Sequence, residues 1–238
     1  MTPAPLIAFL ERGGPALWLI AALSVLTEDE RDLGVTLIDL GAGITSAAIF
    51  RDNTLVHVDA LGVGGRNITS DLARGLSTPF EAAERIKMIY GSCLHGADDE
   101  TSFVPCPPIA AQDELHEEPR SLVTNIIRSR VEETLELLRE RIHKAGLENY
   151  AGRQVVLTGG GAHLNGVREL ATHVLGKRVR IGQPHGVFGL SEQLSQPDFA
   201  VATGLLKQVF EDRPEVITGP PDLSGRRLKT QRYSGNAF

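Results

Sequence analysis

Apolar residues in this chain of 238 residues fall into short runs and alternations that predict strands. The predicted strands are Val35–Leu40, Thr45–Phe50, Leu55–Leu61, Thr101–Cys106, Gln154–Leu157 and Val179–Ile181. Short polar turns join the first three, which predicts an antiparallel meander.

Other segments repeat their apolar residues every three or four positions, which predicts helices. The predicted helices are Asn67–Gly75, Phe80–Tyr90, about Ser121 to Ala145, a helix capped by Asn165 and ending at Leu175, and Pro197–Glu211. Thr78 and Glu81 have the spacing of a capping box for the second of these helices. Gly91 and Gly146 are expected to end the second and third helices. The order of strands, a helical segment, and then a strand, turn and helix predicts α/β layers with an insertion.

The run Ala16–Leu26 is apolar but too short to span a bilayer, which needs about 20 residues. No basic segment or cleavage site typical of a signal peptide frames it. We therefore interpret it as a core element whose packing partners lie outside this chain. The acidic stretch Thr27–Asp32 is expected to lead directly into the first strand.

Composition limits the possible functions. Apolar residues make up 42% of the chain and charged residues 23%, which is typical of a folded, soluble domain. The net charge of −6 argues against nucleic acid as the main partner. Cys93 and Cys106 form no Cys-x-x-Cys pair, so buried thiols are favoured over a disulfide, and a zinc site is not expected.

Two glycine-rich turns are the strongest candidates for chemistry. In Asp39–Thr45, glycines let backbone N–H groups approach an anion, and an aspartate at a strand end can hold Mg²⁺ directly or through water. In Thr158–Ala162, three glycines precede a helix whose N-terminus favours phosphate. An ordinary glycine hairpin and a tight strand-to-helix connection explain the two turns equally well when each is taken alone. Neither turn has the pattern of a P-loop or of a dinucleotide fingerprint.

Glu84 and Lys87 lie one turn apart on the predicted Phe80–Tyr90 helix. They have the donor and acceptor groups needed to bind ribose hydroxyls. A solvated surface pair is the simpler explanation for two such residues in isolation.

Taken together, these pieces resemble a known family. The segment Leu33–Phe50 resembles the second phosphate motif of the actin/Hsp70/sugar-kinase superfamily, and Val155–Val167 resembles its adenosine motif. Four further segments resemble the FtsA family of bacterial cell-division proteins: Leu26–Val35, Gly64–Asp71, Ala83–Lys87 and the later Ile181–Pro184. The two glycine motifs alone are typical of the superfamily, whereas the ordered set is specific to FtsA and covers about Ala22 to Lys207.

The resemblance implies a role for each matching position. Asp39 would hold Mg²⁺, through water, beside the phosphates. The β- and γ-phosphates of ATP would face Gly41, Gly43, Ile44 and Thr45. The nucleotide would be flanked by Gly64 and Gly65, its ribose would meet Glu84 and Lys87, and its α-phosphate and adenosine would approach Gly159, Gly160 and Gly161.

The resemblance also implies a fold and its division. We expect an α/β, actin-like (ribonuclease H-like) subdomain made of residues 34–62 and 153–211. A mostly helical subdomain, residues 63–152, is expected to be inserted into it. Residues 1–33 are an atypical N-terminal segment, and residues 212–238 are expected to form a flexible basic tail.

The implied function is that of an ATP-binding scaffold that tethers FtsZ to the cytoplasmic face of the inner membrane, assembles into filaments and helps build the division septum. In the family, the insertion receives the C-terminal peptide of FtsZ, and Arg66, Arg74, Arg85 and Lys87 are candidate contacts for an acidic peptide. The alternatives are a fragment of a sugar kinase or Hsp70-like ATPase, and an FtsZ-binding module without nucleotide. Met1–Ile20 does not resemble the family, and the tail has no amphipathic membrane-targeting run after its basic stretch. We therefore expect a partial version with half of the cleft and weak ATP binding.

Overall fold

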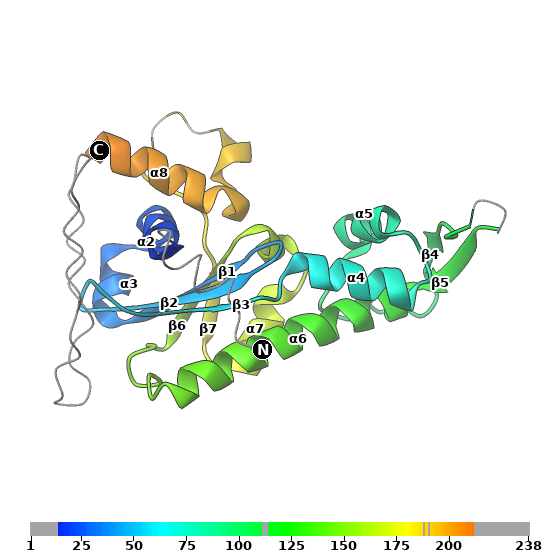
Figure 1. Cartoon of the computed structure of the whole chain (residues 1–238), viewed down its shortest axis with the longest axis horizontal. Helices are drawn as coiled ribbons and strands as arrows, with labels where there is room; N and C mark the ends of the chain where they lie inside the picture. Colours follow the sequence, from blue (N-terminus) through cyan, green and yellow to red (C-terminus); the bar gives the residue numbers. More distant parts are fainter. Residues whose placement is uncertain (1–13, 111–113, 188, 190, 212–238) are drawn as a thin grey trace.

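The computed structural model describes residues 14–110, 114–187, 189 and 191–211 (Figure 1). Its strands are β1 (Val35–Leu40), β2 (Thr45–Arg51), β3 (Thr54–Leu61), β4 (Phe103–Cys106), β5 (His116–Pro119), β6 (Gln154–Thr158) and β7 (Arg178–Ile181). Its helices are α2 (Gly14–Val25), α3 (Glu28–Leu33), α4 (Gly65–Gly75), α5 (Phe80–Tyr90), α6 (Arg120–Lys144), α7 (Val167–Leu175) and α8 (Ala200–Glu211). Three short 3₁₀ helices are η1 (Gly160–His163), η2 (Glu192–Ser195) and η3 (Pro197–Phe199). The expected basic tail, residues 212–238, lies outside the described residues.

The main sheet has five strands in the order β3-β2-β1-β6-β7. The first three strands are antiparallel, which confirms the meander, and β6 and β7 run parallel to β1. Nearly every residue of β1 is buried because strands flank it on both edges and helices cover both faces. Asp39 pairs with Thr158 at the carboxyl ends of β1 and β6. The two glycine turns therefore leave the sheet side by side.

Helices cover the sheet on both faces, so the α/β expectation is confirmed. Helices α2 and α8 lie on one face, and α6 and α7 lie on the other (Figure 1). Leu37 and Val156 of the sheet pack with Ala22, Val25 and other residues of the first face. On the second face, residues of the sheet share a core with the buried stripe of α6: Ile38, Leu157, Ile127, Leu135 and Leu138.

The segment from α4 to the first half of α6 projects beyond the sheet (Figure 1). It contains α4, α5 and a two-stranded hairpin of β4 and β5. Leu72 of α4 and Val104 of β4 belong to the same buried cluster as the sheet residue Ile38. Helix α6 therefore joins the projecting segment to the sheet through one continuous core.

Helix α2 packs inside this chain, so our interpretation of the apolar N-terminal run as an element without partners is wrong for residues 20–26. Ala21, Ala22 and Val25 are buried against the sheet and α8. A Cβ at Gly204 of α8 would lie 1.9 Å from the carbonyl oxygen of Ile20, so the two helices cross at close range. The last carbonyls of α2 accept hydrogen bonds from distant donors: Leu23 from Lys207 Nζ (3.0 Å), Ser24 from the His185 amide (2.8 Å) and Val25 from Arg180 Nη2 (2.8 Å).

Several helix ends differ from the sequence prediction. The acidic stretch forms the helix α3, with a capping box made by Thr27 and Glu30. The capping box predicted at Thr78 is wrong, because its hydroxyl donates to the Pro107 carbonyl (2.7 Å) and Pro79 is the N-cap of α5. Asn165 does not cap α7, whose N-cap is Gly166.

Other local expectations are confirmed. Gly91 is the C-cap of α5, and Gly146, with φ of +69°, follows the C-cap of α6. Both cysteines are buried free thiols, and burial raises the pKa of Cys93 to about 12. Among the described helices, none combines the length and apolar character needed to cross a bilayer.

Candidate functional site

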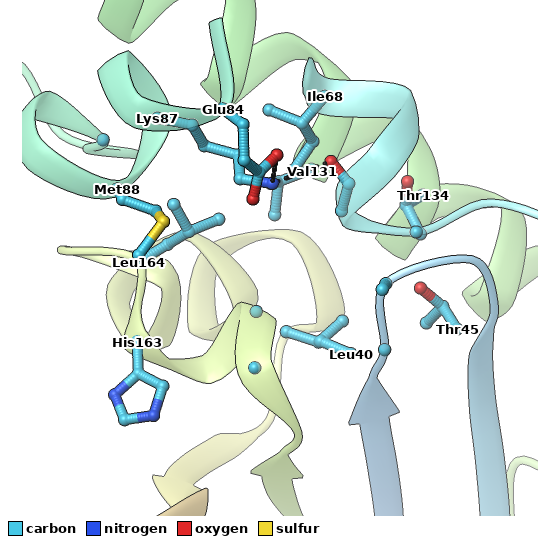
Figure 2. A pocket seen from close by; sticks show the side chains of 17 residues that line it. Leu40, Thr45, Ile68, Glu84, Lys87, Met88, Val131, Thr134, His163 and Leu164 are labelled. Carbon is cyan, nitrogen blue, oxygen red and sulfur yellow. Dashed lines mark hydrogen bonds and ion pairs between the residues drawn. The ribbon is translucent and has the colours of Figure 1, made fainter. Parts of the chain in front are cut away.

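A cavity of about 430 Å³ lies at the edge of the sheet where the two glycine turns emerge (Figure 2). Ligand pockets commonly have volumes of about 300–1,000 Å³. The predicted site residues that line it are Gly41, Thr45, Gly64, Gly65, Glu84, Lys87, Gly160 and Gly161. The other four, Asp39, Gly43, Ile44 and Gly159, are not part of the lining. Residues far apart in sequence thus converge on one space.

The glycines of the second turn have different tasks. A Cβ at Gly159 would lie 2.1 Å from Asp39 Oδ1, and one at Gly161 would lie 2.7 Å from Leu40 Cβ. Both positions therefore need glycine so that the turn can pack against the end of β1. No atom lies within 4 Å of a Cβ built at Gly160. Gly160, which lines the cavity, is therefore the member of this turn whose position does not need glycine for packing.

The first turn is shaped by close backbone contacts. The Gly41 amide donates to the Ile44 carbonyl (3.0 Å), and a Cβ at Gly41 would lie 2.7 Å from that oxygen. A Cβ at Gly64 would lie 2.6 Å from the Gly41 carbonyl oxygen. The glycines at 41 and 64 therefore allow the turn and the start of α4 to lie in contact.

Asp39 lies at the end of β1, directly beside Gly159. Burial raises the pKa of its carboxyl group above the ordinary value. No described residue donates a hydrogen bond to this carboxylate. A half-buried carboxylate with no donor suits a cation held through water, because Mg²⁺ usually keeps several waters and binds through one or two carboxylates plus phosphates. Asp39 thus fits the expected water-mediated magnesium contact, without supplying a complete site.

Helix α5 presents an ion pair to the cavity (Figure 2). Lys87 Nζ lies 2.7 Å from Glu84 Oε2, and the Thr69 hydroxyl also bonds this carboxylate. Burial raises the pKa of Glu84, but the hydrogen bonds from Lys87 and Thr69 and the charges of Lys87 and Arg66 outweigh this effect, so the pKa lies below its ordinary value. Glu84 is therefore a carboxylate at neutral pH and remains 40% exposed.

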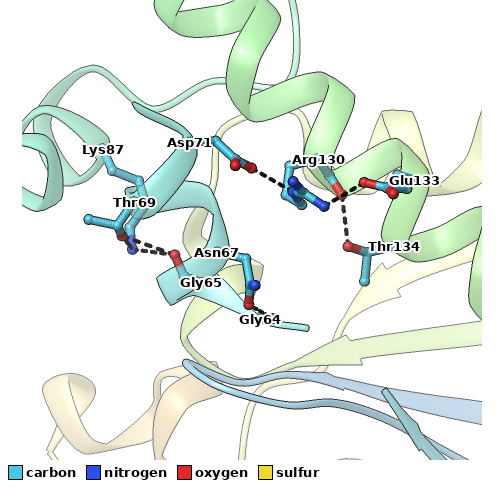
Figure 3. A network of polar contacts seen from close by, with 9 residues as sticks. All are labelled: Gly64, Gly65, Asn67, Thr69, Asp71, Lys87, Arg130, Glu133 and Thr134. Carbon is cyan, nitrogen blue, oxygen red and sulfur yellow. Dashed lines mark hydrogen bonds and ion pairs between the residues drawn. The ribbon is translucent and has the colours of Figure 1, made fainter. Parts of the chain in front are cut away.

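Helix α4 is held from three sides, and Figure 3 shows its contacts with Lys87 and Arg130. The Gly65 amide donates to the Gly41 carbonyl (3.0 Å) and the Arg66 amide to the Ala42 carbonyl (2.7 Å), which attaches the first turn of α4 to the glycine turn. Lys87 of α5 bonds the Gly65 carbonyl (3.1 Å). On the other side, Arg130 Nε of α6 bonds Asp71 Oδ2 (2.6 Å).

The sequence prediction missed the apolar part of the lining. This part comes from β1, α4, α5, α6 and the C-cap of η1, and contains Leu40, Ile68, Met88, Val131 and Leu164. Val131 belongs to the apolar stripe of α6, and periodicity identifies such a stripe without showing which member faces a cavity. Thr134 and His163 also line the cavity, and His163 Nε2 lies 3.0 Å from Asp198 Oδ1. An apolar wall beside a few polar groups suits a flat, weakly polar ring such as a nucleobase.

Comparison with known proteins points to one family. The sequence profile of the family described as "Cell division protein FtsA" matches residues 36–204. The FtsA of Rhizobium meliloti is 45% identical over 188 residues, which are 78% of this chain and 42% of the relative. The FtsA of Escherichia coli is 33% identical over 199 residues, or 79% of this chain and 46% of the relative. The chain thus spans less than half the length of these relatives.

Solved structures show the same fold at low sequence identity. MreB5 of Spiroplasma citri bound to ADP superposes with a TM-score of 0.62 at 18% identity, over 82% of this chain and 60% of that chain. The PilM-PilN type IV pilus biogenesis complex superposes with a TM-score of 0.56 at 24% identity, over 82% of this chain and 49% of that chain. These likenesses confirm the actin-like fold. Together with the profile match, the identity to curated relatives shows that this chain belongs to the FtsA family of cell-division proteins.

Proposed function

We propose that this chain forms one wall of the ATP-binding cleft of an FtsA-like cell-division scaffold. The observation that carries this proposal is the convergence of both glycine turns, the start of α4 and the Glu84 side chain on one cavity. The likeness to MreB5 structures bound to ADP and to AMPPNP supports a nucleotide as the ligand.

The polar and apolar parts of the lining suggest how a nucleotide would lie. The turn Gly41–Thr45 and Gly160 offer backbone groups and open space to phosphates. Glu84 would accept hydrogen bonds from ribose hydroxyls, because carboxylate oxygens accept and do not donate. Met88, Val131 and Leu164 would exclude water around the base. Asp39 would orient water molecules around Mg²⁺, whose charge offsets the negative charge of the phosphates.

Thermal unfolding with Mg-ATP tests this proposal. At a ligand concentration ten times Kd, binding stabilises a protein by about 1.4 kcal/mol, which corresponds to a midpoint rise of about 3–6 °C at this size. We expect Mg-ATP to raise the thermal midpoint of the wild type and to leave that of Asp39→Ala unchanged. The affinity is expected to be weak, because a single wall supplies only part of the contacts. No rise with Mg-ATP and no calorimetric heat would favour a partner-binding module without nucleotide.

We also propose that the insertion expected at residues 63–152 receives the acidic C-terminal peptide of FtsZ on its projecting segment. Arg66, Arg74 and Arg85 are exposed on α4 and α5, so they are available to an acidic partner. Lys87 is only 15% exposed and pairs with Glu84, which makes it a poor candidate for this surface. In the whole protein, this contact would link FtsZ to the cytoplasmic face of the membrane, and self-association would build filaments.

Peptide titration separates this role from general charge attraction. The variant carrying Arg74→Glu and Arg85→Glu is expected to bind an FtsZ C-terminal peptide at least about tenfold more weakly. Arg168→Glu on α7 is the control, since Arg168 is an exposed arginine outside the projecting segment. An equal loss of affinity for the FtsZ peptide in both variants would contradict a docking surface on α4 and α5.

A further inference from the structure

The hairpin of β4 and β5 has one buried face and one exposed face. Val104 and Cys106 of β4 are buried in the core that also contains residues of α4 and α6. The alternate residue Phe103 is 55% exposed, and Pro105 is exposed as well. Successive side chains of a strand point to opposite faces. The outer face of the hairpin therefore presents apolar side chains to solvent.

This exposed apolar surface continues beyond the two strands. Ile109, which follows β4, is 71% exposed, and Leu115, which precedes β5, is 60% exposed. A single exposed apolar residue needs no explanation, whereas several on one element mark an interaction site. We refer to Phe103, Pro105, Ile109 and Leu115 as the hairpin patch.

Negative charge accompanies the hairpin patch. Glu117 pairs with Pro105 across the hairpin, so it belongs to the exposed face. Four exposed acidic residues lie in or beside the two strands: Asp98, Glu100, Glu114 and Glu117. Within the described part of the chain, no cation forms an ion pair with any of them, because the nearby Arg120 pairs with Asp99 instead. The surface therefore suits a segment that has both apolar and basic side chains.

The C-terminal sequence of this same chain has that composition. Residues 226–238 contain no acidic residue and four basic ones: Arg226, Arg227, Lys229 and Arg232. Leu228, Tyr233 and Phe238 add apolar side chains to the same stretch. Its charge is thus opposite to that of the hairpin, and it has apolar groups to place against the hairpin patch.

We propose that the hairpin patch of one copy binds the basic segment 226–238 of a second copy. Helix α8, which precedes this segment in the chain, lies at the opposite end of the molecule from the hairpin (Figure 1). Helix α6, with 25 residues, is about 38 Å long and covers only part of that distance. A flexible chain of the 14 residues from 212 to 225 has a mean span of about 20 Å. Contact between copies is therefore favoured over contact within one chain.

The contact would be head-to-tail, because each copy contributes a hairpin to one neighbour and a basic segment to another. It depends on neither the nucleotide site nor the FtsZ-binding surface. Exposed ion pairs are individually weak and are screened by salt, so the apolar residues must supply part of the affinity. We therefore expect weak self-association that decreases as the salt concentration rises.

Two complementary variants test the contact. The hairpin variant carries Phe103→Ser and Glu117→Lys, and the segment variant carries Arg226→Glu and Arg227→Glu. In sedimentation equilibrium of the full chain, each variant alone is expected to associate at least about tenfold more weakly than the wild type. An equimolar mixture is expected to recover pairs, because the hairpin variant keeps an intact segment and the segment variant keeps an intact hairpin. Contact within one chain would give no such recovery.

Two controls accompany these variants. Glu136→Lys reverses an exposed glutamate of α6 outside the hairpin, and we expect it to associate as the wild type does. The hairpin variant should keep the thermal midpoint of a monomeric sample, since Phe103 and Glu117 are exposed and surface substitutions change stability little. An equal loss of association in Glu136→Lys would overturn the proposal.

Three other results would also overturn it: a wild type that stays monomeric over its soluble range, a mixture of the two variants that stays monomeric, and association that is insensitive to salt. Vesicles of phosphatidylglycerol test the main competing partner of a basic segment. If the segment variant loses binding to these vesicles while its self-association equals that of the wild type, the segment binds lipid and the proposal fails.

Discussion

At the scale of single residues, the same amino acid serves different purposes within one turn. Gly159 and Gly161 remove side chains that would collide with the end of β1, whereas a Cβ at Gly160, which lines the cavity, would meet no neighbouring atom. Gly159 also has φ of +82°, which favours glycine independently of space. Three consecutive glycines look equivalent in sequence, and only their neighbours in space separate packing from ligand access.

Alanine at two of these glycines should separate the two purposes. Gly161→Ala places Cβ 2.7 Å from Leu40 Cβ, so we expect a loss of about 1–3 kcal/mol in the free energy of unfolding. Gly160→Ala is expected to keep its stability within about 0.5 kcal/mol while weakening the binding of Mg-ATP. Chemical denaturation and calorimetry measure the two effects. Comparable losses of stability in both variants would contradict this division.

Asp39 should make the free protein less stable at neutral pH. Burial raises its pKa in the folded state, so ionisation of the carboxyl group favours the unfolded state. The destabilisation is absent below the ordinary pKa and develops as the pH rises through the folded-state value. We therefore expect Asp39→Asn to raise the thermal midpoint at pH 7 without nucleotide and to lose this advantage as the solution is acidified. Lower stability of the variant at pH 7 would contradict the assignment.

At the scale of elements, the sequence patterns located the strands well and the helix ends less well. Strands β1 to β3 and β6 follow from apolar runs and polar turns, which are local properties. Helix α3 was missed because it has no buried residue and hence no apolar stripe. Strand β5 was also missed, since its sequence His-Glu-Glu-Pro has no strand pattern and its conformation depends on pairing with β4. Thr78 illustrates the problem with caps, because a distant carbonyl competes for its hydroxyl.

The link between α3 and the sheet edge depends on Glu30. Its carboxylate receives two hydrogen bonds from Arg180 (2.6 and 2.7 Å) and one from Gln154 (2.6 Å). Burial raises the pKa of Glu30, but the bonds and charge of Arg180 and the bonds to Thr27 lower it more, so the net shift is downward.

We expect Glu30→Gln to lower the free energy of unfolding by about 1–2 kcal/mol at pH 7. This range allows for the partial exposure of Arg180, which weakens the ion pair. Because the folded-state pKa is lowered, this stabilisation is present above the ordinary pKa and disappears as the pH falls through the folded-state value. Urea denaturation at a series of pH values should therefore show that the difference in unfolding free energy between the wild type and Glu30→Gln becomes smaller in acid. A difference in unfolding free energy that stays constant with pH would contradict the charge of Glu30 as the cause of the stabilisation.

At the scale of the whole molecule, the described chain is a sheet between two helical layers, with a helical segment projecting from one end (Figure 1). Helix α2 completes one of these layers. The loss of this helix would expose the sheet face that contains Leu37, Phe50 and Val156. The apolar N-terminal run is therefore part of the folded core, whatever lies before it.

Deletion of residues 1–22 tests that role. It removes most of α2, including Ile20, Ala21 and Ala22, so we expect lower solubility and a lower thermal midpoint. Deletion of residues 1–13 is the control, since it leaves α2 complete. Improved solubility of the longer deletion would show that α2 has no structural role in this chain.

The sequence alone determined the strands of the main sheet, the two glycine turns, the α/β class and the family, because these depend on local patterns and on the order of motifs along the chain. It also indicated the Glu84 and Lys87 pair, as neighbours on one helix face. Only the tertiary structure showed that Lys87 bonds the Gly65 carbonyl, that Gly160 alone in its turn has room for a Cβ, that α6 closes the cavity with Val131 and Thr134, and that α2 belongs to the core. The physical reason is that each of these properties depends on atoms supplied by a distant part of the chain: the Gly65 carbonyl, the end of β1, the face of α6 and the surface of α8.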